Sequence, residues 1–194
     1  MKRILSLITA LGLLLIITSV TLADSSGKVY LDLDGVIGSE YVSDSFYLGA
    51  EYGQVNSNFP NIDEGWIPIA ADFNYYNLKG GYLIINNSAL KFGATLSYMN
   101  CAIDYYGGYR GDTSGFLGGV IGFIQTSKHS SLEGFYDFPV LIINSPTVDK
   151  ELYYFMLKFN YAFTKHFGAS VKLYCISCQY CGLGDLALGI NYLF

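Results

Sequence analysis

Hydrophobic and polar residues alternate with a period of two along most of the chain, which is typical of β-strands with two different faces. In the segment 89–99, for example, every second residue from Leu90 to Tyr98 is apolar. After the N-terminal region we find nine such segments separated by turn residues: 28–37, 45–55, 67–77, 89–99, 115–125, 132–143, 152–163, 167–176 and 185–194. A short tenth candidate is Tyr82–Ile85. The pattern predicts an all-β, antiparallel fold.

The second face of these segments distinguishes a barrel from a soluble β-sandwich, whose strands also alternate. It consists mainly of Gly, Ser, Ala, Asn and Thr, with an occasional single charge. A narrow barrel interior needs small residues and few charges, whereas a solvent-facing sheet normally carries many Lys and Glu. The strand phase places four acids and three lysines on this face, where we expect them to pair inside the lumen: Asp32, Asp34, Glu51, Asp72, Lys91, Lys158 and Lys172.

The connections between the segments differ in length. Three are short (86–88, 126–131 and 164–168), and 177–184 is also compact. Two others, 100–114 and 144–151, are longer and polar or glycine-rich. Short turns that alternate with longer loops are typical of a transmembrane barrel with periplasmic turns and extracellular loops. We therefore expect an up-and-down transmembrane β-barrel.

The N-terminal region has the features of an export signal. Lys2 and Arg3 precede an apolar stretch, and the small residues Thr21 and Ala23 follow at a cleavage spacing. We predict a signal peptide over 1–23 and a barrel domain over 24–194. The alternative is an uncleaved anchor helix, because Ile4–Ala23 is just long enough to span a membrane.

The last segment carries a more specific pattern. Apolar residues occupy every second position up to an aromatic at the final one: Leu186, Leu188, Ile190, Tyr192 and Phe194. This resembles the C-terminal signal of bacterial outer-membrane barrels, in which the barrel-assembly machinery recognises the last strand and the strand then closes the barrel against the first. The resemblance implies location in the bacterial outer membrane, with membrane lipid and the assembly machinery as partners.

The length without the signal peptide resembles that of small eight-stranded barrels of the OmpA membrane-domain, OmpX and Ail kind. Both termini of such a barrel are periplasmic, so the strand number is even. Nine segments therefore require that one be spurious or one be missed. Either 28–37 is a plug-like lead-in, or Tyr82–Ile85 is a separate strand. We predict eight strands, with ten as the alternative.

Composition agrees with a membrane protein and argues against nucleic-acid binding. Apolar residues make up 52% of the chain and charged residues only 14%, against about 25% in soluble domains. Loss of the signal peptide leaves nine basic and sixteen acidic residues, with Arg110 as the one arginine. Such a chain offers no basic patch to a nucleic acid.

Four cysteines lie in the part expected to be exported: Cys101, Cys175, Cys178 and Cys181. Three of them form a C-x-x-C-x-x-C run, a spacing at which thiolates can bind a metal ion, but no fourth ligand lies nearby in the sequence. An oxidising compartment favours disulfides, and four cysteines permit three pairings that the sequence does not distinguish. We expect disulfides, with free thiols and a metal site as alternatives, and no cofactor.

Enzymatic chemistry has little support. Some outer-membrane barrels are enzymes that need a histidine near the outer rim, but His129 and His166 both fall in predicted periplasmic turns. His129 and Ser131, with Glu133 nearby, superficially resemble the lipid A deacylases, whose surrounding residues are absent here. We therefore expect a non-enzymatic protein.

The sequence predicts a structural or adhesive role carried by extracellular loops, with an unidentified surface ligand. Three alternatives remain open at this point. They are a small pore or transporter for hydrophobic solutes, a lipid A-modifying enzyme, and a soluble secreted sandwich.

Overall fold

The structure, a computed structural model, describes residues 26–61, 67–105, 110–145, 152–178 and 181–194. The signal peptide expected over 1–23 lies outside these ranges. The described residues form ten strands: β1 (Ser26–Asp32), β2 (Val36–Val42), β3 (Phe46–Asn61), β4 (Ile67–Asn86), β5 (Leu90–Tyr105), β6 (Arg110–Gln125), β7 (Ser130–Asn144), β8 (Leu152–Ala162), β9 (Phe167–Cys178) and β10 (Cys181–Leu193). Within these ranges the chain contains no helix both long enough and apolar enough to span a bilayer.

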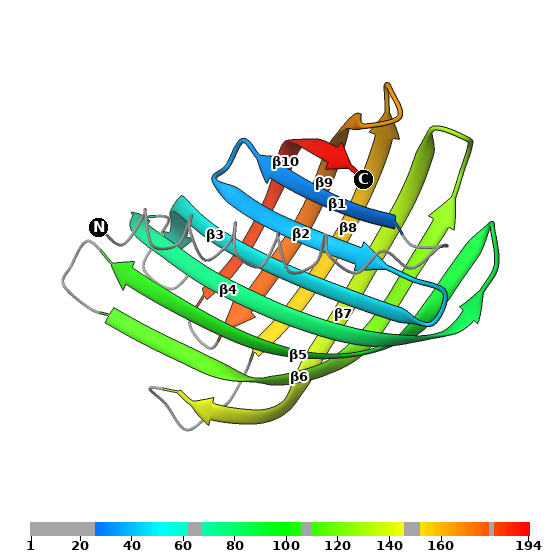
Figure 1. The fold of residues 1–194 in the computed structure, drawn as a ribbon. Coiled ribbons are helices and arrows are strands. Elements are labelled where there is room, and N and C mark those ends of the chain that lie inside the picture. The colour runs from blue at the N-terminus through cyan, green and yellow to red at the C-terminus, as the bar shows by residue number, and fades with distance from the viewer. Residues whose placement is uncertain (1–25, 62–66, 106–109, 146–151, 179–180) are drawn as a thin grey trace.

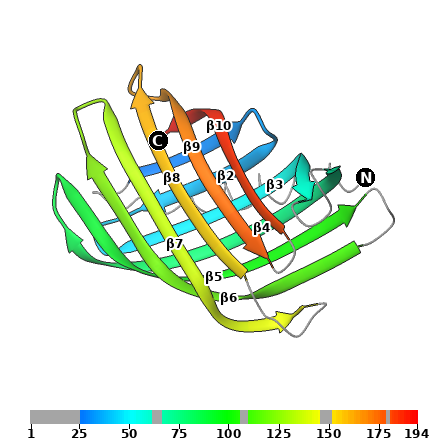
Figure 2. The ribbon, with the colours of Figure 1, turned by 180° about the vertical axis from the view of Figure 1, so that it is seen from behind.

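The strands make a closed antiparallel barrel in which each strand pairs with its neighbours in the sequence (Figures 1 and 2). Closure comes from β1 and β10, which pair from Lys28↔Leu193 to Asp32↔Gly189. The first and last described strands therefore lie side by side, as up-and-down topology requires. Because the sheet closes on itself, backbone N–H and C=O groups find partners on both sides wherever neighbouring strands overlap.

The expected number of eight strands is wrong, and the alternative of ten is correct. The segment 28–37 is not a lead-in, because it contains the end of one strand and the start of the next, β1 and β2. Tyr82–Ile85 is not a separate strand either, since it is the last part of the 20-residue β4. The missing strand was therefore 36–42, which the periodicity of 28–37 concealed.

A tight turn separates β1 from β2. Gly35 has φ of 93°, a left-handed conformation that L side chains rarely adopt. Its N–H donates to the Asp32 carbonyl at 3.1 Å, and the Val36 N–H donates to the Asp34 carboxylate at 3.4 Å. Asp and Gly at these positions are typical of such turns because the aspartate side chain caps the backbone and glycine accepts the positive φ.

The two ends of the barrel differ, and we name them by their connections. The turn end carries the short connections 43–45, 87–89, 126–129 and 163–166, together with the start of β1 and the end of β10. The loop end carries the Asp32–Val36 turn and the opposite ends of the other strands. The sequence predicted the turns at 86–88, 126–131 and 164–168, and the structure places all three at the turn end.

The outer surface of the barrel is apolar. In the described part, nine of the ten strands expose large hydrophobic side chains outward, such as Leu96 of β5, which is 57% exposed. Inward side chains at the alternate positions are buried, as Thr95 and Ser97 show. This is the distribution expected of a barrel in an apolar surrounding, with the polar face inside.

One proline interrupts this regular pairing. Pro139 lies in β7 beyond Asp137↔Tyr154, the last pair that β7 makes with β8. On its other side β7 continues to pair with β6, with register shifts between Ser114 and Gly115 and between Phe116 and Leu117. Proline cannot donate to a ladder, so it is tolerated where the strand has a partner on one side alone.

Candidate functional site

The barrel interior is the candidate site, and its described side chains change in character along the axis. A vestibule of about 300 Å³ opens at the turn end, with Lys28 and Glu133 among the side chains that line it. Next comes a charge layer of buried lysines and carboxylates. Beyond it, toward the loop end, lies an apolar layer of buried aliphatic, aromatic and sulfur-containing side chains.

The charge layer is nearly balanced. Nine charged side chains are buried in the described part of the chain, four of them lysines and five carboxylates. They project from seven different strands, and most of their ion pairs join strands that are not neighbours in the sheet. The members are Lys28, Asp32, Glu40, Glu51, Lys79, Glu133, Asp137, Lys158 and Lys172.

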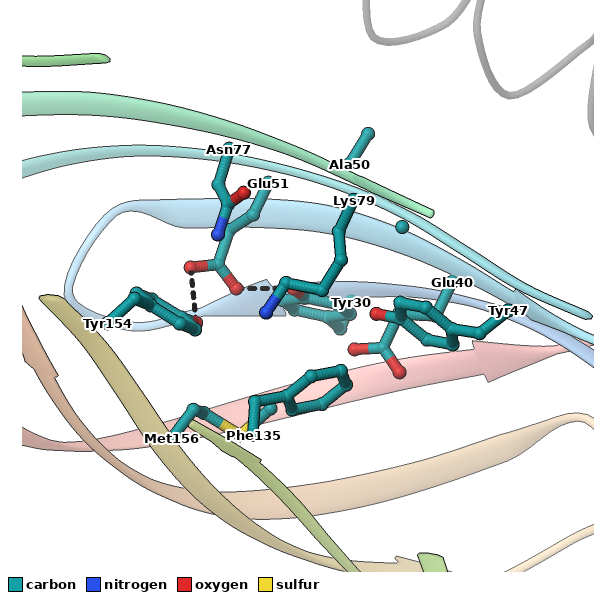
Figure 3. A pocket seen from close by; sticks show the side chains of 11 residues that line it. Tyr30, Glu40, Tyr47, Ala50, Glu51, Asn77, Lys79, Phe135, Tyr154 and Met156 are labelled. Atoms are coloured by element: carbon teal, nitrogen blue, oxygen red, sulfur yellow. Dashed lines mark hydrogen bonds between the residues drawn. The ribbon is translucent and has the colours of Figure 1, made fainter. Parts of the chain in front are cut away.

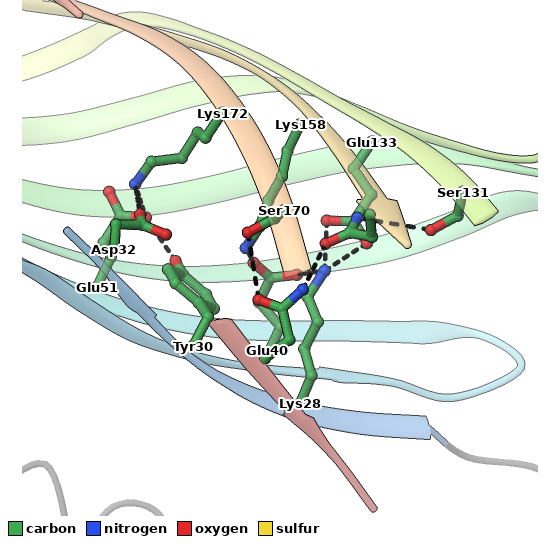
Figure 4. A network of polar contacts seen from close by, with 12 residues as sticks. Lys28, Tyr30, Asp32, Glu40, Glu51, Ser131, Glu133, Lys158, Ser170 and Lys172 are labelled. Carbon is green, nitrogen blue, oxygen red and sulfur yellow. Dashed lines mark hydrogen bonds and ion pairs between the residues drawn. The ribbon is translucent and has the colours of Figure 1, made fainter. Parts of the chain in front are cut away.

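The first group of this layer lies next to the vestibule (Figure 4). The Lys28 ammonium contacts the Glu133 carboxylate and lies 2.9 Å from a Glu40 oxygen. The Lys158 ammonium lies 3.6 Å from the other Glu40 oxygen and 3.3 Å from the centroid of the Tyr30 ring. Lys158 is 0% exposed, so the carboxylate and the ring face supply the attraction that water cannot.

A second group surrounds Glu51. The Lys172 ammonium lies 2.5 Å from Asp32 and 3.6 Å from Glu51. Glu51 also accepts hydrogen bonds from three tyrosine hydroxyls: Tyr30 and Tyr75, each at 2.5 Å, and Tyr154 at 3.1 Å. Hydrogen bonds to an ionised carboxylate are stronger than those between neutral groups, so Glu51 is well satisfied although it is buried.

The third group joins β4 to β7, and Figure 3 shows two of the side chains involved, Lys79 and Phe135. Lys79 contacts the Asp137 carboxylate, and the Thr95 hydroxyl donates to Asp137 at 2.9 Å. The Lys79 ammonium also lies 4.2 Å from the centroid of the Phe135 ring. A small cavity of about 20 Å³ adjoins Lys79 and Asn77, which is room for one water molecule.

The apolar layer closes the lumen toward the loop end. Its members are no more than 4% exposed, and they come from β2, β3, β4, β5, β6, β8 and β9. The layer comprises Val36, Val55, Phe73, Met99, Cys101, Leu117, Leu152 and Ile176. Buried apolar side chains thus occupy the described part of the lumen on the loop-end side of the charge layer.

Four of the seven predicted lumen charges lie in the charge layer. Lys172, Asp32 and Glu51 meet in one group, as described above. Lys158 points inward, but its carboxylate partner is Glu40 rather than one of the four predicted acids.

The other predicted lumen charges lie away from the charge layer. Asp34 accepts a hydrogen bond from the Tyr174 hydroxyl at 2.7 Å near the loop end, where the half-buried Asp72 also lies. Lys91 is half-buried and lines the vestibule, and it forms no ion pair with any carboxylate whose side chain the structure describes.

Sequence reasoning missed five members of the charge layer. Glu40 was missed because β2 was not recognised, and Lys79 because β4 continues past residue 77. Glu133 and Asp137 lie on the inward phase of the predicted segment 132–143, and Lys28 shares the phase of Asp32. The alternation of these segments was therefore a signal that could have found the last three.

The last strand presents its predicted signal residues outward. All five are exposed on the barrel surface: Leu186, Leu188, Ile190, Tyr192 and Phe194. The backbone of Phe194 exchanges two hydrogen bonds with Gly27, at 3.0 and 3.1 Å, and its ring lies over the space where a Gly27 side chain would be. The terminal aromatic thus packs at the seam where β10 meets β1.

The cysteines are spread over two regions. Cys101 is buried in the apolar layer, whereas Cys175 is an exposed free thiol on the outer face of β9. Cys178 and Cys181 occupy directly opposite positions of β9 and β10, but their side chains lie outside the described part. The expectation of disulfides in this set stays a prediction. The described residues contain no group of three or more possible metal ligands.

The histidines lie where the sequence predicted them, in turns at the turn end. Glu133, which follows the His129-x-Ser131 pair, is engaged by Lys28. The nitrogen Nδ1 of His166 lies 3.2 Å from the Leu193 carbonyl. Neither arrangement links a histidine to a nucleophile and a carboxylate among the described residues.

Comparison with known proteins gives structural likeness alone. No protein-family model and no curated protein sequence matches the chain. The chain is similar to a loop-deletion mutant of OmpT, an outer membrane protein of Vibrio cholerae, with 13% identity and a TM-score of 0.41. The likeness covers 87% of this chain and 62% of the OmpT mutant, so this chain spans less than two thirds of that protein. It is also similar to the NanC porin (9% identity, TM-score 0.46, 88% of this chain and 98% of that one). A third likeness is to an outer membrane channel from Pseudomonas putida F1 (11% identity, TM-score 0.44, 90% and 96%). Values this low do not assign the chain to a family.

Proposed function

We propose that this chain is a barrel of the bacterial outer membrane with a sealed interior, and that its role is structural or adhesive. The working surface in this proposal is the loop end, which faces outward from the cell. The barrel-assembly machinery is the partner that inserts it. The observation that carries the proposal is the filled lumen, in which a charge layer is backed by an apolar layer.

The outer surface supports the membrane part of the proposal. A bilayer core offers no water to backbone polar groups, so a spanning β-structure must be closed. This barrel is closed, and large apolar side chains cover nine of its ten strands in the described part. An apolar surface of that extent is far larger than a soluble monomer normally exposes, and the soluble sandwich is correspondingly disfavoured.

The interior supports a role that does not depend on conduction. Opening a path would require separating the pairs of Lys172 and Lys79 from their carboxylates as well as parting the apolar layer. Breaking a buried pair so that one charge is left alone costs about 3–5 kcal/mol. Several such separations at once make a steady open state rare.

A pore for small solutes is the second candidate, and one observation favours it. The vestibule of about 300 Å³ reaches into the barrel from the turn end as far as Lys28 and Glu133. A solute path would begin in this way if the layers beyond it rearranged. An enzymatic role has no such support, because Glu133 beside the His129 turn is already ion-paired.

Single-channel recording in planar bilayers separates the two candidates. We expect the purified, refolded chain to insert without a steady conductance step. A comparison variant with the apolar layer cut back, Phe73→Ala with Leu117→Ala, should leak more than the wild-type chain. Regular steps from the wild-type chain would overturn the sealed barrel and favour the pore.

A further inference from the structure

Among the side chains that the structure describes outside the charge layer, the charged ones differ in sign between the two ends of the barrel. The chain as a whole has a net charge of −5, yet the basic side chains that the structure describes outside the charge layer all lie at the turn end. The loop end shows aspartates alone among its described charged side chains. The residues are Lys91, Lys128, Lys165 and Asp44 at the turn end, and Asp34, Asp72 and Asp112 at the loop end.

Two of the turn-end lysines converge on the vestibule. Lys91 lines it from β5 and Lys128 from the β6–β7 turn, and His129 of the same turn also lines it. Neither lysine forms an ion pair with any carboxylate whose side chain the structure describes. The vestibule therefore holds cationic groups that the protein itself does not neutralise.

The carboxylates that line the vestibule do not neutralise Lys91 and Lys128, because they are already paired with lysines of the charge layer. Glu133 contacts Lys28, and Glu40 is shared between Lys28 and Lys158. Turning Glu40 toward Lys91 or Lys128 would leave the buried Lys158 without its carboxylate partner. Turning Glu133 away would leave Lys28 and Lys158 to share Glu40 alone. The charge of the vestibule lysines is thus available to a molecule that enters from outside.

The shape of the vestibule increases the effect of these charges. Its walls include the apolar side chains of Val42 and Phe123, and residues from eight of the ten strands line it. Low-dielectric walls strengthen the field of the charges in a cleft, so counter-ions should concentrate near Lys91 and Lys128, which the carboxylates of the vestibule do not neutralise. Its volume of about 300 Å³ suits a small ligand rather than a polymer.

We propose that the vestibule is a binding site for a small anion, recognised through a carboxylate or phosphate group by Lys91 and Lys128. A free solute and a lipid headgroup both carry such groups, and the test below distinguishes these two sources. The site itself follows from the charges and the cavity. This inference rests on the proposed function only for the statement that the site faces the periplasm. Failure of the anion site would therefore leave the sealed outer-membrane barrel standing, and the reverse also holds.

The test uses the full chain refolded into nanodiscs of phosphatidylcholine, with folding checked by the shift between unboiled and boiled samples on a gel. Inorganic phosphate and succinate are titrated separately, and binding is followed by NMR shifts of amides in the 126–131 turn. We expect saturable binding that weakens with added salt, because the lysines are partly exposed. The variants Lys91→Gln and Lys128→Gln should each weaken it by up to about fivefold, which corresponds to about 1 kcal/mol.

Lys165→Gln is the matched control. Lys165 is exposed, as Lys128 is, and lies at the same end, but it does not line the vestibule. Its loss should leave binding unchanged. Equal weakening by Lys165→Gln, or titrations that do not saturate with either anion, would overturn the proposal.

A second arm identifies the source of the anionic group. The chain is placed in nanodiscs that also contain phosphatidylglycerol, and the phosphate titration is repeated. Weaker phosphate binding in these discs supports a lipid headgroup as the natural occupant, and unchanged binding supports a free solute. In either case the conductance test of the sealed lumen is unaffected, since it does not depend on the vestibule lysines.

Discussion

The most informative residues of this barrel are the buried charges, because each has a specific partner. Lys172 is 0% exposed and lies between Asp32 and Glu51. The two carboxylates differ in their other contacts, since Glu51 accepts from three tyrosines. Asp32 therefore depends on Lys172 far more than Glu51 does.

Replacing Lys172 by methionine should destabilise the folded barrel by about 3–5 kcal/mol, because Asp32 would remain buried without its counter-charge. The double variant Lys172→Met with Asp32→Leu should recover most of that loss, since an apolar pair can replace a buried ion pair at little cost. Urea unfolding in micelles, followed by tryptophan fluorescence or gel shift, measures both variants.

Lys165→Met, in an exposed turn, is the control and should change the free energy of unfolding by no more than about 0.5 kcal/mol. If the double variant were as unstable as the single one, Asp32 and Lys172 would not be coupled in the folded protein.

At the scale of the strands, the β1–β2 hairpin depends on its turn. A side chain at Gly35 would meet both an unfavourable φ of 93° and the Gln54 carbonyl at 2.8 Å. Gly35→Ala should therefore destabilise the barrel by about 1–2 kcal/mol, and Gly35→Asn by less, because asparagine tolerates positive φ better.

Gly80→Ala provides the comparison, since an added side-chain carbon there would lie at an ordinary 3.9 Å from Leu48. Urea midpoints of the three variants test the prediction. Equal midpoints for Gly35→Ala and Gly80→Ala would mean that the turn does not constrain the hairpin.

The last strand supports a prediction about assembly. Deleting Phe194 removes one outward aromatic, about 1.5–3 kcal/mol of burial, and its two backbone hydrogen bonds to Gly27. We expect near-normal refolding in micelles but poor insertion in cells, because the residue proposed as the assembly signal is lost. Phe194→Tyr, which keeps an aromatic ring, should insert well. Surface levels of the truncated chain equal to wild type would count against the outer-membrane proposal.

The strands show which parts of the fold the alternation of apolar and polar residues predicts and which parts it misses. Period-2 segments located nine of the ten strands, but they concealed β2, because apolar residues continue on both sides of Gly35. The Asp34-Gly35 pair was an available turn signal. Tyr82–Ile85 was separated from β4 since Gly80 and Gly81 interrupt the apolar pattern, although glycines inside a barrel can simply make room for neighbours.

At the scale of the whole molecule, the lumen shows what alternation cannot supply. The sequence placed Lys158 and Lys172 on the inward face, and the structure has both inside. Which acid each lysine meets depends on strand register and barrel stagger, so that Lys158 meets Glu40 from β2, far from it in the sequence. The order of vestibule, charge layer and apolar layer along the axis depends on the same stagger, so no short stretch of the sequence predicts it.

The central claim is that the lumen is open to water at the turn end and closed at the apolar layer, and two thiol positions test it directly. Cys101 lies in that layer and is 1% exposed, whereas Asn160 lines the vestibule. One chain keeps Cys101 and carries serine at Cys175, Cys178 and Cys181; the other carries Asn160→Cys, with alanine at Cys101 and serine at the other three native cysteines. Both are folded in micelles and treated with a charged, water-soluble thiol reagent.

The account predicts that the cysteine at position 160 reacts at once, while Cys101 reacts only as fast as the barrel unfolds and fully after heating. Labelling of Cys101 in the folded barrel at the rate seen for position 160 would contradict the sealed lumen.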